Sequence, residues 1–303
     1  MTHVIITGGS SGIGLALASI YAARGARLSL IARSRDLLEQ AAQKLVQEGG
    51  IETGAVHVEA ADVSKEEEVG AAISRCMDRF GPCDILVTSA GIVEPAAFEA
   101  LPGAAFTRQI ETNFSGSVHA IRVTSAGIDE PAAFEALPGA AFTRQIETNF
   151  SGSVHAIRAV YPEMVKRRNG HIVLVSSGAG LIGIYGYTAY CASKFALSGF
   201  AQALRSEARC HNVRISICFP PDTETPQFRR ELAARPEEAS VVMGAVRPWT
   251  AEAVARKIVK GVDQRRFEIY FGMALHLLGR FGPAVRPLID WWFDRAIARR
   301  SGR

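Results

Sequence analysis

Two side chains that could move a proton lie one helical turn apart in the second half of the chain. Tyr190 and Lys194 are spaced i, i+4, which puts both on one face of a helix. A tyrosine hydroxyl has an ordinary pKa of about 10, and a neighbouring ammonium stabilises the phenolate and lowers that pKa. The pair is therefore predicted to exchange a proton with a carbonyl oxygen while a nicotinamide exchanges hydride with the carbonyl carbon.

A glycine-rich segment near the amino end could hold the phosphates of such a nicotinamide cofactor. Residues 7–14 read TGGSSGIG, directly after an apolar strand pattern and at the start of a helical one. Glycines allow a tight turn and a close approach of the backbone, so a pyrophosphate can lie on the free N–H groups at the helix start. The predicted cofactor contacts here are Gly8, Ser10, Ser11, Gly12, Ile13 and Gly14.

The end of the next strand indicates which dinucleotide is bound. An enzyme that uses NAD places an acidic residue about 20 residues past the loop, to hold the ribose 2′-hydroxyl. Here the strand ends at Arg33, with Arg35 shortly after, and a guanidinium favours the 2′-phosphate of NADP(H). The alternative is that Arg33 is a solvated loop cation. Asp36 is expected in the first turn of the following helix.

The elements that must position these residues alternate along the chain. Segments whose apolar residues recur every three or four positions separate six short apolar runs. The runs are HVIIT, ARLSLIA, AVHVEAA, DILVTSA, HIVLVSS and VRISICF. This alternation predicts a single-domain α/β fold, a Rossmann-like doubly wound parallel sheet with helices on both faces. We expect this domain over residues 1–268 and an amphipathic extension over residues 269–303.

A 36-residue segment, residues 87–122, is repeated at once as residues 123–158, with Val93 and Asp129 as the one difference. Two near-identical copies are too few for a solenoid, so we interpret them as a tandem duplication inside one domain.

Each copy lacks part of an element that the fold needs. The strand DILVTSAG has its upstream half only before copy one, and the helix that ends near Arg168 has its downstream half only after copy two. We therefore expect the strand from copy one and the helix from copy two, with the intervening residues looped out. That insertion is expected to display one apolar helix face, formed by Phe106, Ile110, Phe114 and Val118.

The glycine loop, the Tyr190–Lys194 pair and a serine 13 residues before the tyrosine together resemble the short-chain dehydrogenase/reductase family over residues 7–225. The resemblance implies that Tyr190 is the catalytic acid/base and that Lys194 also binds the cofactor ribose. It implies that Ser177 orients the substrate carbonyl, with Ser176 in its place if the register differs by one.

The resemblance also implies an asparagine that holds a proton-relay water. The duplication provides two, Asn113 and Asn149, and the expected division of the copies selects Asn149. Family members commonly form homo-oligomers through the helices that carry Asn149 and Tyr190.

Further cofactor contacts follow from the same resemblance. They are Asp62 and Val63 at the adenine, Ala90 and Gly91 at the adenine ribose, and Thr223 and Thr225 at the carboxamide and diphosphate. The family usually has Asn where this chain has Ser89, which affects a minor contact that stabilises the sheet.

The segment PPDTETP, residues 220–226, narrows the resemblance to the 3-ketodihydrosphingosine reductases within this family. The implied reaction is NADPH-dependent reduction of the C3 ketone of 3-ketosphinganine, in sphingolipid biosynthesis. Two alternatives stay open. The ketone could be another hydrophobic carbonyl compound, such as a steroid, a retinoid or a fatty-acyl compound, or the duplication could have left an NADP-binding protein without turnover.

Composition argues against several other classes of protein. The net charge of +4 is small for 303 residues and is spread along the chain, which argues against a nucleic-acid partner. Five cysteines without a CxxC spacing indicate neither a disulfide framework nor a zinc site, and the seven histidines form no cluster, so no metal is expected. The amino end lacks the pattern of a signal peptide, and a cytoplasmic location is expected.

The C-terminal extension is too apolar for a solvated tail. Between Tyr270 and Arg300, two apolar stretches are interrupted by Arg280, Arg286 and Asp290, and neither is long enough to span a bilayer. Trp291 and Trp292 stand among arginines, a combination that binds at the headgroup boundary of a membrane. We therefore expect peripheral contact with the cytoplasmic face of a membrane. The alternative is an arm that caps the substrate cleft or packs on a partner subunit.

Overall fold

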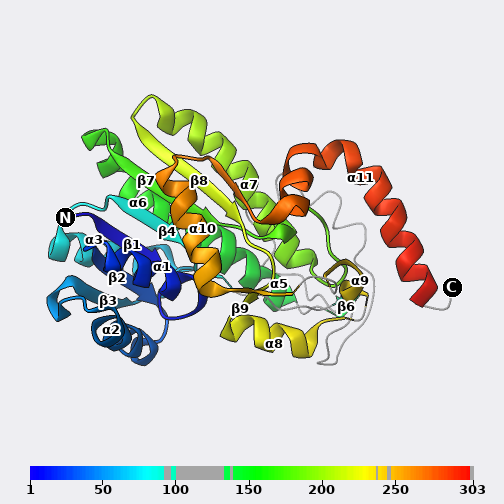
Figure 1. Ribbon diagram of the computed structural model, residues 1–303, viewed down its shortest axis with the longest axis horizontal. Coiled ribbons are helices and arrows are strands. Elements are labelled where there is room, and N and C mark those ends of the chain that lie inside the picture. Colours follow the sequence, from blue (N-terminus) through cyan, green and yellow to red (C-terminus); the bar gives the residue numbers. More distant parts are fainter. Residues whose placement is uncertain (92–96, 100–132, 137–138, 237, 244–246, 301–303) are drawn as a thin grey trace.

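The computed structural model describes residues 1–91, 97–99, 133–136, 139–236, 238–243 and 247–300. At its centre lies a sheet of seven parallel strands in the order β11-β8-β7-β4-β1-β2-β3 (Figure 1). The strands are β1 (His3–Thr7), β2 (Arg27–Ala32), β3 (Val56–Ala60), β4 (Ile85–Thr88), β7 (Gly170–Val175), β8 (Val213–Phe219) and β11 (Glu268–Tyr270). The six predicted strands and the parallel sheet are confirmed, and β11 is an additional strand.

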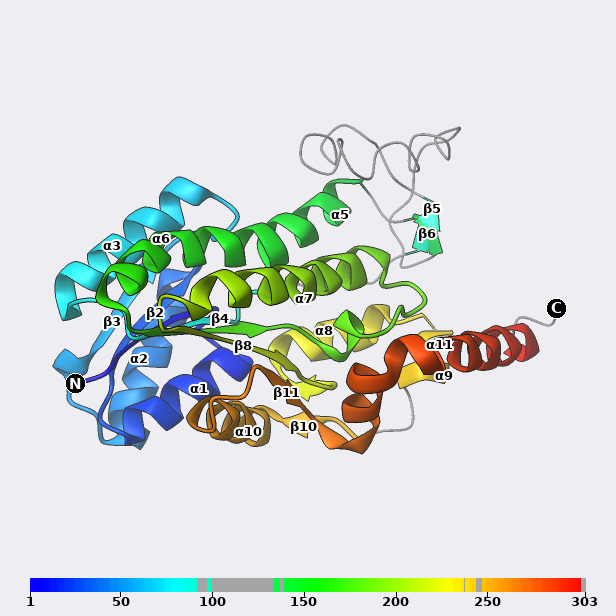
Figure 2. The same cartoon turned by 90° about the horizontal axis from the view of Figure 1, so that it is seen from above.

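Helices cover both faces of the sheet (Figure 2). One layer contains α1 (Gly12–Ala23), α2 (Arg35–Gly49) and α10 (Ala251–Asp263), and the other contains α3 (Glu66–Phe80), α6 (Gly152–Arg167) and α7 (Thr188–Arg209). Successive strand residues point to opposite faces, so Val4 and Ile6 pack in the first layer and Ile5 packs in the second. The doubly wound architecture therefore follows from strands that are apolar on both faces.

The duplicated segment is divided as the sequence predicts. Copy one supplies the end of β4, and copy two supplies α5 (Gly139–Ile146), a π-helical turn (Glu147–Ser151) and the first part of α6. Each copy also forms one short strand at corresponding residues, β5 (Ala97–Glu99) in copy one and β6 (Ala133–Ala136) in copy two. These two strands pair in parallel. The apolar helix face predicted from Phe106 to Val118 lies outside the described residues.

After β8 the chain forms several short elements at the carboxyl edge of the sheet. They are β9 (Thr223–Glu224), α8 (Pro226–Ala234), α9 (Ala239–Met243) and β10 (Trp249–Thr250), and β9 pairs with β10. The chain then returns through α10 to β11, so Ile269 and Tyr270, which the sequence assigns to the extension, belong to the sheet.

The extension proper is α11 (Gly272–Arg300), which leaves the body of the protein at the carboxyl edge of the sheet (Figure 2). It contacts α9 and β11. Within the described ranges, no helix is both long and apolar enough to cross a membrane.

The strand order determines where a ligand can lie. From β1 the chain proceeds outward through β2 and β3, and then returns to β4 on the other side of β1. In such sheets the crevice for a dinucleotide lies at the carboxyl ends of the two strands that flank this reversal. Here those strands are β1 and β4.

Candidate active site

The Tyr190 and Ser177 hydroxyls face each other at the carboxyl edge of the sheet. Ser177 follows β7, Tyr190 lies in the first turn of α7, and the two side chains interact through a hydrogen bond. The Ser177 oxygen also accepts a hydrogen bond from the backbone N–H of Ala179 at 3.2 Å, which holds the hydroxyl in place. Both side chains are partly exposed, so a carbonyl compound can reach them.

The neighbouring Ser176 has a different environment. It is buried, and its hydroxyl donates a hydrogen bond to the Lys194 carbonyl oxygen at 3.1 Å. Because successive residues at a strand end point in opposite directions, only one of the two serines can face Tyr190. The structure places Ser177 there, and Ser176 attaches α7 to the sheet instead.

Lys194 lies fully inside the protein, beneath the tyrosine. Its ammonium donates to the Val175 carbonyl oxygen at 3.1 Å and lies 5.5 Å from the centroid of the Tyr190 ring. An ammonium has three donors, and this is the single hydrogen bond that it makes to residues described in the structure. A Cβ built on Gly91 would lie 3.6 Å from the ammonium nitrogen, so the segment that follows β4 meets α7 here. The remaining donors fit the hydroxyls of a ribose.

Asn149 is the fourth side chain of this group. It is completely buried in the π-helical turn before α6, and its amide nitrogen donates to the Ser193 hydroxyl at 3.0 Å. Ser193 in turn donates to the Tyr190 carbonyl oxygen at 2.7 Å. A Cβ on Gly91 would lie 3.3 Å from the Asn149 side-chain oxygen. Copy two of the duplication therefore brings its asparagine to the helix that carries the tyrosine and lysine.

The environment shifts the pKa values of both proton-carrying groups. Burial raises the pKa of Tyr190, although its hydrogen bond with Ser177 lowers it. This shift is opposite in direction to the one that the sequence predicts from Lys194. Burial also lowers the pKa of Lys194 to about 8, because the charged ammonium is removed from water. Tyr190 is thus protonated near neutral pH, which is the form that donates a proton to a carbonyl oxygen.

The glycine loop forms a narrow turn between β1 and α1. Gly8 has a positive φ of 73°, and a Cβ there would lie 2.7 Å from the Ala90 backbone nitrogen. A Cβ on Gly14 would collide with the Gly8 carbonyl oxygen, and one on Gly12 would lie 2.9 Å from the Thr225 methyl group. Side chains at these positions would fill the crevice between β1 and β4, so the glycines keep it open for a ligand.

The start of α1 suits an anion. Its cap residue, Ser11, makes no side-chain hydrogen bond to the helix within the described chain, and the first turn contains no acidic residue. The N–H groups of a first helical turn lack partners inside the helix, and the helix dipole places positive charge there. These features fit the pyrophosphate of a dinucleotide.

Arg33 and Arg35 differ in their contacts. Arg35 forms an ion pair with Glu39 at 3.0 Å, one turn further along α2. Arg33 is exposed after β2, and its guanidinium pairs with no carboxylate of the described residues. Although burial raises the pKa of Asp62, hydrogen bonds from Ser64 and the charge of Arg33 hold it below its usual range. Arg33 is therefore the arginine that can accept a 2′-phosphate.

The other expected cofactor contacts occupy the same edge of the sheet. Val63 is buried against α6, where a Cβ on Gly152 would lie 2.7 Å from its methyl group. The Thr223 hydroxyl donates to the Pro221 carbonyl oxygen at 2.8 Å. The Thr225 oxygen accepts from the Phe228 N–H at 3.1 Å and so caps α8, which leaves its own O–H available as a donor.

A buried polar cluster beside Tyr190 was not among the predicted site residues. Glu231 accepts hydrogen bonds from the Tyr187 hydroxyl and from Arg235, both at 2.7 Å, and Arg235 also donates to Asp222 at 3.0 Å. The Tyr187 ring packs edge-on against Tyr190, with 6.4 Å between the centroids. The cluster thus connects α8 to the start of α7. Two sequence signals were available: the i, i+3 spacing of the tyrosines and the i, i+4 spacing of Glu231 and Arg235.

A family model matches most of the chain. The model described as short chain dehydrogenase matches residues 2–125 and again residues 120–236. The first match ends, and the second begins, inside the duplicated segment, as expected when one domain contains two copies of a stretch that the family has once.

Curated relatives cover nearly the whole chain. The 3-ketodihydrosphingosine reductase of Bos taurus is 33% identical over 287 residues, which are 94% of this chain and 76% of that protein. The 3-dehydrosphinganine reductase TSC10A of Arabidopsis thaliana is 33% identical over 293 residues, 96% of this chain and 77% of that protein.

A solved structure supports the fold. The crystal structure of levodione reductase superimposes with a TM-score of 0.70 at 24% identity, over 89% of this chain and 95% of that chain.

Proposed function

Because the chain belongs to the short-chain dehydrogenase family, we propose that it is an NADPH-dependent reductase of a long-chain ketone. The proposed ketone is the C3 carbonyl of 3-ketosphinganine, and the product is sphinganine. The similarity to 3-ketodihydrosphingosine reductase, 33% identity over 94% of this chain, is the observation that carries the choice of substrate. The arrangement of Tyr190, Ser177 and Lys194 supports the reaction type.

In this proposal the chain itself handles the proton and the carbonyl oxygen. Bound NADPH supplies the hydride that reaches the carbonyl carbon. Tyr190 donates its proton to the carbonyl oxygen, and Ser177 donates a hydrogen bond to the same atom and orients it. Lys194 binds the ribose and stabilises the tyrosinate left behind. Asn149 holds the water through which the tyrosine regains its proton.

The substrate assignment is tested by NADPH consumption, followed by absorbance, with 3-ketosphinganine in detergent micelles. We expect NADPH oxidation together with formation of sphinganine. Faster turnover of a steroid, retinoid or fatty-acyl ketone would show that the enzyme reduces a different ketone by the same type of reaction. Binding of NADPH without oxidation by any of these ketones would instead indicate a protein inactivated by the duplication. The position of Asn149 beside Ser193 argues for an intact site.

The two asparagines of the duplication provide a matched pair of variants. Asn149→Ala should lower kcat at least about 10-fold, because it removes the buried amide proposed to hold the relay water. Asn113→Ala, in the same local sequence, should leave kcat unchanged. Steady-state rates of the two variants measure the difference. If Asn113→Ala had the larger effect, copy one would supply the relay.

Cofactor preference is expected to depend on Arg33. Arg33→Ala should raise the Kd of NADPH about 10- to 100-fold and leave the Kd of NADH nearly unchanged, because only NADPH has the 2′-phosphate. Arg35→Ala is the matched control, since Arg35 already pairs with Glu39. Fluorescence titration of both cofactors gives the values. An equal loss of affinity for NADPH and NADH would rule out the 2′-phosphate role.

We also propose that α11 attaches the enzyme to a membrane. Large apolar side chains recur every three or four residues along its exposed side: Met273, Leu277, Phe281, Val285, Leu288, Trp291 and Trp292. The Arg295 guanidinium lies 5.2 Å from the centroid of the Trp291 ring, where it can reach lipid phosphates while the ring enters the acyl layer. At the other end of α11, a Cβ on Gly178 would lie 3.2 Å from Leu275, next to Ser177. Leu275 packs against the core on the other side of the helix, so α11 begins beside the active site and carries its exposed apolar face away from there.

Flotation with liposomes tests the membrane contact. The wild-type chain should float with liposomes that contain phosphatidylserine, and a triple variant, Phe281→Ser, Leu288→Ser and Trp292→Ser, should remain at the bottom of the gradient. Leu37→Ser, which changes an equally exposed apolar residue on α2, should float like the wild type. Unchanged flotation of the triple variant would favour the alternative, in which α11 caps the substrate cleft or packs on a partner subunit.

The homo-oligomer stays a prediction from the family resemblance, and the cytoplasmic location stays a prediction from the cysteine pattern and the amino end of the sequence. Light scattering of the purified chain would measure the first.

A further inference from the structure

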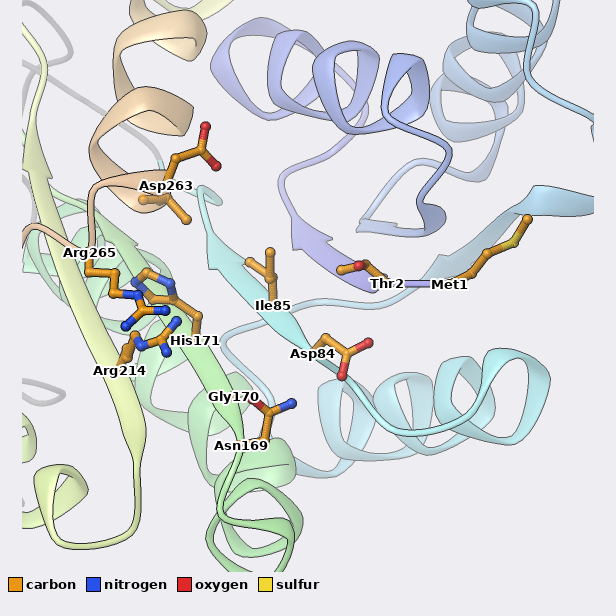
Figure 3. A pocket seen from close by; sticks show the side chains of 11 residues that line it. Met1, Thr2, Asp84, Ile85, Asn169, Gly170, His171, Arg214, Asp263 and Arg265 are labelled. Atoms are coloured by element: carbon orange, nitrogen blue, oxygen red, sulfur yellow. The ribbon is translucent and has the colours of Figure 1, made fainter.

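A cavity open to solvent lies at the amino edge of the sheet, opposite the candidate active site. Its volume is about 570 Å³, and the first residues of β4, β7 and β8 and the last residues of α10 line it. This volume is in the range of sites that hold small molecules. Figure 3 shows the Arg214 and Arg265 side chains beside the His171 ring, with Asp84 across the cavity.

The two carboxylates that line this cavity do not pair with its two arginines. Asp84 accepts hydrogen bonds from Arg167 at 3.2 Å and from the His3 N–H at 2.9 Å. Asp263 accepts two from Arg24, both at 2.9 Å. Both carboxylates are therefore engaged by groups outside the lining.

The two arginines of the lining have no such partners. Neither the Arg214 nor the Arg265 guanidinium makes an ion pair or hydrogen bond to any residue within the described ranges. Arg214 is partly buried, so its charge is not fully solvated. Arg265 is exposed and lines the same cavity, so an anion bound there would be attracted to both guanidinium groups.

The third group on this wall, His171, adds no charge. It is buried, and its Nε2 lies 2.8 Å from the Ser216 hydroxyl, which donates its own proton to the Arg266 carbonyl oxygen at 2.6 Å. Nε2 must therefore be the donor to Ser216, which leaves Nδ1 unprotonated in the neutral ring. Burial, together with the charge of Arg214, lowers the pKa of His171 to about 4. Near neutral pH the positive charge of the wall comes from the two arginines.

We propose that this cavity is a second ligand site, separate from the dinucleotide crevice, where Arg214 and Arg265 bind the phosphate group of a small molecule. A guanidinium presents paired N–H donors that match two oxygens of a phosphate, and two guanidinium groups match its double negative charge. This proposal about the cavity holds whichever ketone the enzyme reduces.

The test is titration of inorganic phosphate into the full chain saturated with NADP⁺, which occupies the dinucleotide crevice. Calorimetry at ionic strength held constant with NaCl should show saturable binding. Arg214→Gln and Arg265→Gln should each weaken it at least about 10-fold. Arg256→Gln removes the same charge from an exposed position on α10 and should bind phosphate as the wild type does.

Arg214→Lys distinguishes a fitted site from a general field of positive charge. It keeps the charge and loses the planar pair of donors, so phosphate binding should fall between those of the wild type and Arg214→Gln. Thermal unfolding of each variant with NADP⁺ confirms that it is folded. The proposal is overturned if the wild type shows no saturable phosphate binding, or if Arg256→Gln weakens binding as much as the two variants in the cavity.

Discussion

Replacing Tyr190 with phenylalanine should lower the turnover of 3-ketosphinganine by about 100- to 10,000-fold, the usual contribution of a positioned proton donor. The change removes the hydroxyl that faces Ser177 and keeps the ring that packs on Tyr187 at 6.4 Å. Ser177 retains its hydrogen bond from Ala179, so the remainder of the site should stay in place. Rates of NADPH oxidation measure the loss.

Binding of the cofactor separates this effect from a general disturbance. The Kd of NADPH should change less than about twofold in Tyr190→Phe, because little contact area is removed. Tyr161→Phe, which removes a partly buried hydroxyl on α6, should keep wild-type activity. A rate for Tyr190→Phe within tenfold of the wild type would exclude Tyr190 as the proton donor.

Replacing Arg235 with methionine should lower the free energy of unfolding by about 3 kcal/mol, since it leaves buried carboxylates without their cation. Arg235 contacts Asp222, Glu231 and Tyr187 together, and its side chain is 8% exposed. Burial already raises the pKa of Glu231 in the intact cluster. Urea unfolding at pH 7 measures the change.

Arg230→Met is the matched control for this variant. It removes an arginine from the exposed side of α8 and should change the free energy of unfolding by less than about 0.5 kcal/mol. The Arg235 variant should also raise KM for the ketone more than it lowers kcat, because the cluster holds α8 against the start of α7. A loss of stability no larger than that of the control would show that water, rather than Arg235, solvates the carboxylates.

Local patterns in the sequence determined the architecture and the core of the site. Apolar runs separated by helical periods predict six strands that the structure confirms, because a strand buried on both faces needs continuous apolar residues. The i, i+4 spacing of Tyr190 and Lys194 places them together on any helix. Even the division of the duplicated copies follows from continuity of the chain, since only copy two leads directly into the end of α6.

Other features were decided by contacts between elements distant in the sequence. Ser176 and Ser177 are chemically equivalent in the sequence, and the approach of α7 to the end of β7 places only Ser177 at Tyr190. The pKa of Tyr190 depends on burial by several elements, which outweighs the single charge that the sequence shows.

The arginines show the same distinction. The buried partners of Arg235 come from three segments, and the cavity with Arg214 and Arg265 forms where strand and helix ends meet. Spacing along one chain determines which residues share a helix face or a strand face. Exposure to water and the pairing of charges depend on all the elements that surround a group, and these were available only from the tertiary structure.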